Sequence, residues 1–112
     1  MKQITYLDFR SIDLRAGKIV SAEPFSEARN PSYVLCVDFG EEVGVLKSSV
    51  QITDLYSIAE LVGKLVVGVV NLPKKQIGKI MSECLVTGFD DEHGRVVLCV
   101  PERPVPIGTR LY

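Results

Sequence analysis

Two strand-like apolar runs, Leu65–Val70 and Leu85–Phe89, flank a long connection that is rich in basic residues. Connections between strands of a small domain usually have about 4–6 residues, and longer ones commonly carry function. This connection contains three lysines, Lys74, Lys75 and Lys79, which can contact phosphates. It also contains apolar side chains that must either pack on the body of the protein or contact a partner: Leu72, Ile77, Ile80 and Met81.

Three further strands are predicted upstream of these runs, because apolar and polar residues alternate there. They cover about Ile12–Ala22, Tyr33–Phe39 and Val43–Val50. The first of them changes parity at Gly17–Lys18, which predicts a β-bulge at that point. A tight reversal at Gly40–Glu42 is expected to join the second and third strands as a hairpin.

One short helix is predicted between the third and fourth strands. Thr53 or Asp54 would cap this helix, and Gly63 would end it. The prediction rests on apolar residues that recur there at helical spacing: Leu55, Ile58, Leu61 and Val62.

The two ends of the chain carry weaker signals. The segment Thr5–Arg10 is either a second short helix, with Thr5 and Asp8 as a capping box, or a plain arm. After the fifth strand, an acidic turn leads into an extra strand over Val96–Val100. The tail that follows is too rich in proline for a regular central strand.

Five strands with one helix between the third and the fourth is the order of an OB-fold, an all-β, five-stranded Greek-key barrel. Residues 1–112 then form a single domain. An OB-fold binds oligonucleotides on its second and third strands and on the loops that join strands one to two and four to five. Here those loops are Glu23–Ser32, which contains Arg29, and Asn71–Ser82, which contains the three lysines. The sequence therefore predicts a nucleic-acid interface on these loops.

The overall charge limits this prediction to a local patch, because the net charge is −1 and the pI is about 5.8. No spacing of His and Cys matches a zinc site, and no nucleophile or carboxylate pair has a catalytic setting. We therefore expect neither an enzyme nor a cofactor. The three cysteines lie far apart in apolar runs, and the N-terminus lacks an apolar signal sequence. A cytoplasmic location without a membrane segment is expected.

Several motifs occur in order along the chain: Asp13–Ile19, Lys47–Ile52, Val69–Pro73 and Ile77–Glu83. Together they resemble the tRNA-binding domain family, which includes free-standing dimeric proteins and the C-terminal domain of many methionyl-tRNA synthetases. Among its members, the small ones described as export-related chaperones are the most similar. The resemblance implies an OB-fold, a homodimer, tRNA binding, and binding of unfolded or preprotein segments.

The resemblance also implies roles for individual residues. Asn71, Ser82 and Glu83 match the polar residues of the family's signature loop, and Lys79 lies beside them. These side chains have a second interpretation, in which Asn71 and Ser82 hold the loop through bonds to the backbone and Glu83 pairs with a lysine. The lysines themselves can equally be a solvated loop that keeps an edge soluble.

A second function, that of a chaperone, rests on apolar residues of the same face. It would hold peptides on four side chains: Phe25, Ile77, Ile80 and Met81. Phe25 and Tyr33 are alternatively platforms on which bases stack, or members of the core. The terminal segments carry more apolar residues than a barrel needs, which predicts that these extensions form a dimer interface: Ile4, Leu7, Phe9, Val105, Ile107 and Leu111.

Overall fold

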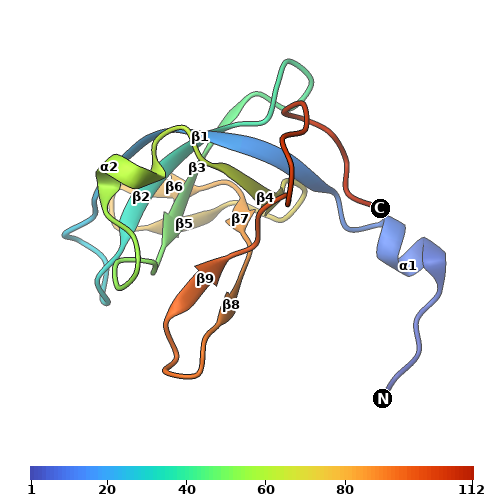
Figure 1. Cartoon of the computed structure of the whole chain (residues 1–112), viewed down its shortest axis with the longest axis horizontal. Coiled ribbons are helices and arrows are strands. Elements are labelled where there is room, and N and C mark those ends of the chain that lie inside the picture. The colour runs from blue at the N-terminus through green and yellow to red at the C-terminus, as the bar shows by residue number, and fades with distance from the viewer.

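The computed structural model describes the whole chain, residues 1–112, and its centre is a five-stranded antiparallel sheet rolled into a nearly closed barrel (Figure 1). The strands of this sheet are β1 (Leu14–Pro24), β2 (Tyr33–Asp38), β3 (Val45–Val50), β4 (Leu65–Val69) and β7 (Leu85–Val86). They are ordered β3-β2-β1-β4-β7, which agrees with the predicted OB-fold. The first four predicted strands are confirmed, with ends that differ by a few residues.

The barrel closes where its two edge strands, β3 and β7, meet through the residues that precede β7. The N–H of Glu83 donates to the carbonyl of Lys47 (N···O 2.7 Å), and the hydroxyl of Ser48 donates to the carbonyl of Cys84 (3.1 Å). These bonds replace the regular ladder that is missing between β3 and β7. They satisfy backbone groups that an open edge would expose.

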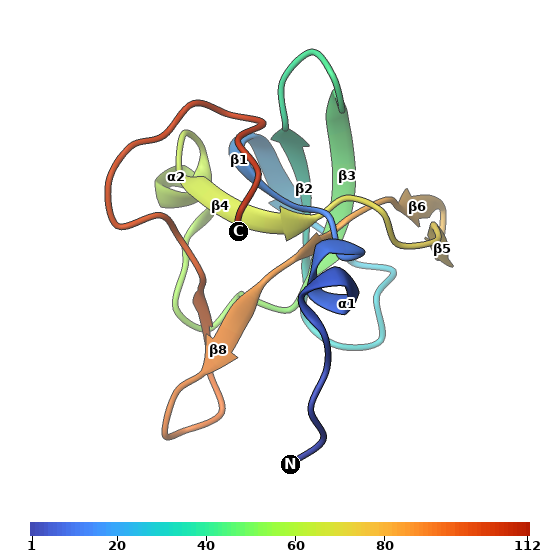
Figure 2. The same ribbon diagram turned by 90° about the vertical axis from the view of Figure 1, so that its right-hand side faces the viewer.

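Two small hairpins extend from the barrel (Figures 1 and 2). One consists of β5 (Lys75–Ile77) and β6 (Ile80–Ser82), and the other of β8 (Gly88–Asp90) and β9 (Val96–Leu98). The single fifth strand predicted over Leu85–Phe89 is therefore wrong, because only its first part pairs with β4 and its second part pairs with β9. In the sequence, an apolar run looks the same whether both of its halves pair with one strand or each half pairs with a different strand.

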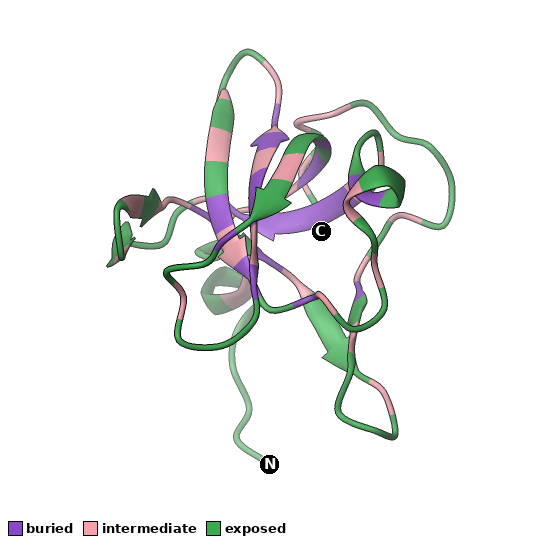
Figure 3. Cartoon of the chain, turned by 90° about the vertical axis from the view of Figure 1, so that its left-hand side faces the viewer, coloured by how far each residue is buried: buried purple, intermediate pink, exposed green.

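Phe39 lies at the centre of the core and is fully buried. Two glycines make room for its ring: a Cβ on Gly17 would lie 2.7 Å from Phe39 Cε1, and a Cβ on Gly68 would lie 2.8 Å from Cζ. The ring of Phe39 therefore packs directly against the backbone of both glycines. Figure 3 shows that buried residues concentrate on β2 and β4, whereas both hairpins are largely exposed.

The irregularity in β1 lies near Val20, where the register with β2 shifts, and the bulge predicted at Gly17–Lys18 is wrong. Gly17 and Ile19 both face the core, so the alternation of inward and outward residues along β1 is not interrupted between them. The misleading residue is Ala16, which is buried on the outer side of β1. The C-terminal tail covers it, and a backbone N–H of that tail donates to its carbonyl (2.7 Å).

Helix α2 (Ile58–Leu61) lies between β3 and β4, as predicted, but it is shorter than predicted. Ser57 caps it, and neither Thr53 nor Asp54 does. The hydroxyl of Ser57 accepts from the N–H of Glu60, while the Glu60 carboxylate accepts from the N–H of Ser57 (2.7 Å). This capping box was readable as the pattern S-x-x-E.

Helix α1 (Tyr6–Arg10) stands apart from the barrel, on the side where the C-terminal tail ends (Figures 1 and 2). The capping box of Thr5 and Asp8 begins it, which confirms the helical interpretation of this segment. None of its residues is buried. No helix in the structure combines the length and the hydropathy that crossing a membrane requires.

Candidate nucleic-acid interface

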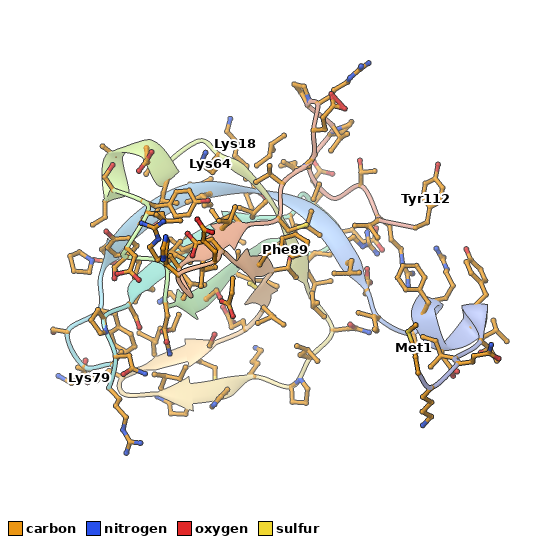
Figure 4. The ribbon with its side chains drawn as sticks, turned by 60° about the horizontal axis from the view of Figure 1, so that its bottom comes forward. Met1, Lys18, Lys64, Lys79, Phe89 and Tyr112 are labelled. Carbon is orange, nitrogen blue, oxygen red and sulfur yellow. The ribbon has the colours of Figure 1, made fainter.

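The basic connection between β4 and β7 is largely folded as the β5–β6 hairpin. Gly78 turns the chain with a φ of 55°, a backbone conformation that residues other than glycine rarely adopt. The amide of Gln76 donates to the carbonyl of Gly78 (2.7 Å) and thereby stiffens the turn. Lys75 begins β5, and Lys79 follows the turn at the tip (Figure 4).

The two loops predicted to bind oligonucleotides lie against each other. A Cβ on Gly78 would be 3.1 Å from the Cβ of Glu27 and 3.3 Å from Cζ of Phe25, so the hairpin tip rests on the β1–β2 loop. That loop is closed by the N–H of Phe25, which donates to the carbonyl of Ser32 (3.0 Å). Phe25 itself is only 7% exposed, so its ring supports the hairpin and has little surface left for a base or a peptide.

A cleft of about 590 Å³ lies between this loop, the end of β3 and the hairpin. Arg29 and Lys75 line it, both are exposed, and neither forms an ion pair within the protein. No acidic residue lines the cleft, and most of the remaining lining side chains carry amides or hydroxyls: Asn30, Ser32, Ser49, Gln51 and Gln76. The structure thus brings together the basic residues of two loops that are far apart in the sequence.

Lys74 differs from the other two lysines because it has a carboxylate partner. Its Nζ lies 3.5 Å from Oε2 of Glu83. The other oxygen, Oε1, accepts from the backbone N–H of Lys47 on β3 (2.9 Å). This backbone bond and the nearby lysines hold the pKa of the Glu83 carboxyl below its usual 4.5. Glu83 therefore joins the hairpin to the barrel seam.

We expect Glu83→Gln to lower the free energy of unfolding near neutral pH, because the amide oxygen is a weaker acceptor than the carboxylate for the Lys47 N–H. The folded-state pKa of Glu83 is depressed, so its contribution is present above pH 4.5 and is lost as the pH falls below that value. Denaturant unfolding at several pH values should therefore show a gap between wild type and variant that narrows in acid. Glu102→Gln, in an exposed pair with Arg103, is the control. A gap independent of pH would contradict this expectation.

Two other polar residues of the signature loop are bonded to the backbone. Asn71 Nδ2 donates to the carbonyl of Ser11 (2.8 Å), and its Oδ1 accepts from the N–H of Asp13 (2.9 Å). The hydroxyl of Ser82 accepts from the N–H of Ser49 (3.3 Å). Asn71 thus anchors the segment before β1, and Ser82 anchors β6 to β3.

The apolar residues of the hairpin divide into two groups. Ile77 and Ile80 face each other across the strands and are half-buried. Met81 is 40% exposed. Next to the hairpin, a hollow of about 160 Å³ is lined partly by Leu72 and Leu85, both of which are exposed.

All three cysteines are free, and no disulfide constrains the site. Cys84 is buried at the barrel seam, whereas Cys36 and Cys99 are half-buried. Burial raises the pKa of the Cys84 thiol to about 12, so this side chain stays protonated and unreactive at neutral pH.

Several lining residues of the cleft were not singled out from the sequence. Ser49 and Gln51 lie at the end of β3, and Asn30 and Gln76 lie beside predicted basic residues. The sequence could have indicated these residues only through their position, since the second and third strands of an OB-fold commonly form part of its binding face. Neutral polar residues at strand ends are too common for that signal to be used alone.

A nearly closed barrel of five antiparallel strands, with a basic cleft between its β1–β2 loop and its β5–β6 hairpin, defines a binding domain of the OB-fold class. The family model described as "Putative tRNA binding domain" matches residues 14–110. The chain therefore belongs to the tRNA-binding domain family, as its motifs indicated.

Relatives of two kinds share this domain. Methionine–tRNA ligase of Nanoarchaeum equitans is 32% identical over 108 residues, a match that covers 96% of this chain but only 13% of that protein. A crystal structure of the chaperone CsaA from Bacillus anthracis is 42% identical, with a TM-score of 0.91 and coverage of 99% of this chain and 100% of that one. CsaA from Picrophilus torridus is 41% identical, with a TM-score of 0.92 and coverage of 98% and 100%.

Proposed function

We propose that this chain is a non-catalytic protein that binds tRNA on its β1–β2 loop and its β5–β6 hairpin. The observation that carries the proposal is the cleft in which Arg29 and Lys75 lie without carboxylate partners, in a chain whose net charge is −1. Lys79 extends the basic surface along the hairpin tip. Such cations are the usual partners of RNA phosphates. Membership of the tRNA-binding domain family supports the same ligand.

The remaining predicted residues receive supporting roles in this proposal. Lys74 would exchange the carboxylate of Glu83 for a phosphate, so we expect it to contribute less than Lys75. Asn71, Ser82 and Glu83 would hold the loops in place through the backbone bonds described above. A cytoplasmic location follows from the ligand, and recovery of a tagged chain outside the cytoplasm would contradict it.

Titration of tRNA into isotope-labelled protein locates the site directly. We expect amide signals to shift in the β1–β2 loop, at the end of β3 and in the β5–β6 hairpin, because these elements surround the cleft. Signals of helix α1 serve as an internal control, since that helix stands apart from the barrel and does not line the cleft. Shifts confined to β8–β9 or to α1 would contradict the proposed site.

We also propose a homodimer formed by the terminal extensions. Leu7 in α1 is 78% exposed and Tyr112 at the C-terminus is 91% exposed. Helix α1 and the C-terminus lie on the same side of the molecule (Figure 1). A neighbouring hollow of about 260 Å³ is lined mainly by apolar residues of the tail and of the outer faces of β1 and β4. A second copy would cover this surface and would join two basic clefts for one large ligand. A monomeric mass by sedimentation at micromolar concentration would contradict the dimer.

The alternative function is that of a chaperone for unfolded or preprotein segments. Leu72 and Leu85 favour it, because they are exposed apolar side chains at a small hollow beside the hairpin, and Met81 is a further exposed apolar side chain on the hairpin itself. Ile77 and Ile80 would add only their half-exposed surfaces, and Phe25 would act indirectly. Binding of an apolar peptide should be insensitive to salt and weakened by Met81→Asp. Failure of such peptides to bind at low or high salt would remove this alternative.

A further inference from the structure

The cleft that Arg29 and Lys75 line contains more polar side chains than two phosphate contacts require. Its volume of about 590 Å³ is that of a site for one small ligand, since such sites commonly span about 300–1,000 Å³. The side chains of Asn30 and Gln51 line it and form no hydrogen bond within the protein. The side-chain amide of Gln76 donates a hydrogen bond to the carbonyl of Gly78, and its own side-chain oxygen remains free to accept a hydrogen bond. Three amide side chains are thus available to a ligand.

We infer that this cleft seats one unpaired RNA nucleotide and reads its base through these amides, an inference that rests on the tRNA-binding function proposed above. A side-chain amide offers a donor beside an acceptor. Every base offers such a pair on its Watson–Crick edge, for example the amino group and N1 of adenine or N3–H and O4 of uracil, and that edge is free to bind an amide only when the base is unpaired. Arg29 and Lys75 would hold the phosphates on either side of that nucleotide.

The borders of the cleft favour a single nucleotide over a continuous strand. On the far side of Asn30 and Gln51 lies a second polar hollow, and Asp54 and Asp90 line it. These carboxylates would repel a phosphate backbone that continued in that direction. The strand would therefore enter and leave over the basic hairpin.

The absence of aromatic residues from the lining sets the kind of recognition. Proteins that bind single strands without sequence preference stack bases on aromatic rings. Here no Phe, Tyr or Trp lines the cleft, and Phe25 is buried beneath the hairpin tip. Hydrogen bonds to the base edge remain as the means of recognition, so the site should discriminate unpaired nucleotides from paired ones.

Competition against labelled tRNA tests this inference, with short single-stranded oligomers of adenylate, cytidylate or uridylate and an RNA duplex as competitors. We expect the three single-stranded oligomers to compete about fivefold or more better than the duplex, whose base edges are already paired. Gln51→Ala should reduce this preference for single strands, while the exposed Gln3→Ala should preserve it. The salt dependence of tRNA binding should remain in both variants, because neither removes a charge.

Equal competition by all oligomers and by the duplex would overturn the inference and leave tRNA binding intact. A preference for single strands that is unchanged in Gln51→Ala would likewise show that the cleft does not bind the base. Absence of tRNA binding by the wild-type protein would instead refute the proposed function itself, so the two failures are distinguishable.

Discussion

Replacing Lys75 and Lys79 together with alanine is expected to weaken tRNA binding by about 10- to 30-fold at about 150 mM salt, because two phosphate contacts are lost. Both lysines are exposed on the β5–β6 hairpin, and neither is held by a carboxylate. Each lost contact should also reduce the slope of log K against log salt by about 0.7–0.9. Equilibrium binding of labelled tRNA at several salt concentrations measures both effects.

The matched control is Lys18→Ala with Lys64→Ala, which removes the same charge from another part of the barrel (Figure 4). This pair should change the affinity by less than about threefold, because neither lysine lines the cleft and distant charges are largely screened at this salt concentration. If both double variants weakened binding equally, the effect would be one of net charge, and the site would not lie on the hairpin.

Phe39→Ala is expected to lower the free energy of unfolding by about 3–5 kcal/mol, the usual cost of truncating a buried aromatic side chain. The ring is fully buried and fills the space beside Gly17 and Gly68, and these two glycines have no side chain that could fill the cavity. Urea unfolding gives this loss as a lower midpoint at an unchanged slope. A loss of that size is a large fraction of the stability of a small domain.

Phe89→Ala is the matched control, because it makes the same substitution on the exposed side of the β8–β9 hairpin. Phe89 is 68% exposed, so the expected change is within about 0.5 kcal/mol. Equal losses at positions 39 and 89 would show that Phe39 does not fill the centre of the core.

Local patterns were sufficient to predict the elements and their order. Alternating apolar residues located the first three strands, and the apolar run Leu65–Val70 located the fourth. The lysines between β4 and β7 were readable as a basic cluster on a binding loop. The OB-fold and the family followed from strand order and motifs.

Contacts between distant segments could not be predicted in the same way. The bond from the Lys47 N–H to Glu83 spans 36 residues, and the bond from Asn71 to Ser11 spans 60. No local pattern records such pairs. The burial of Ala16 under the tail misplaced the bulge for the same reason, because a residue covered by a distant segment resembles one that faces the core. The cleft itself exists only because the β1–β2 loop meets the hairpin.

The most direct test of the central claim is the affinity of the purified wild-type chain for bulk tRNA at low and at physiological salt. We predict measurable binding that weakens steeply as salt rises, with a slope that reports several phosphate contacts. Binding that did not change with salt, or no binding even at low salt, would contradict the account. The basic cleft would then serve a ligand other than RNA.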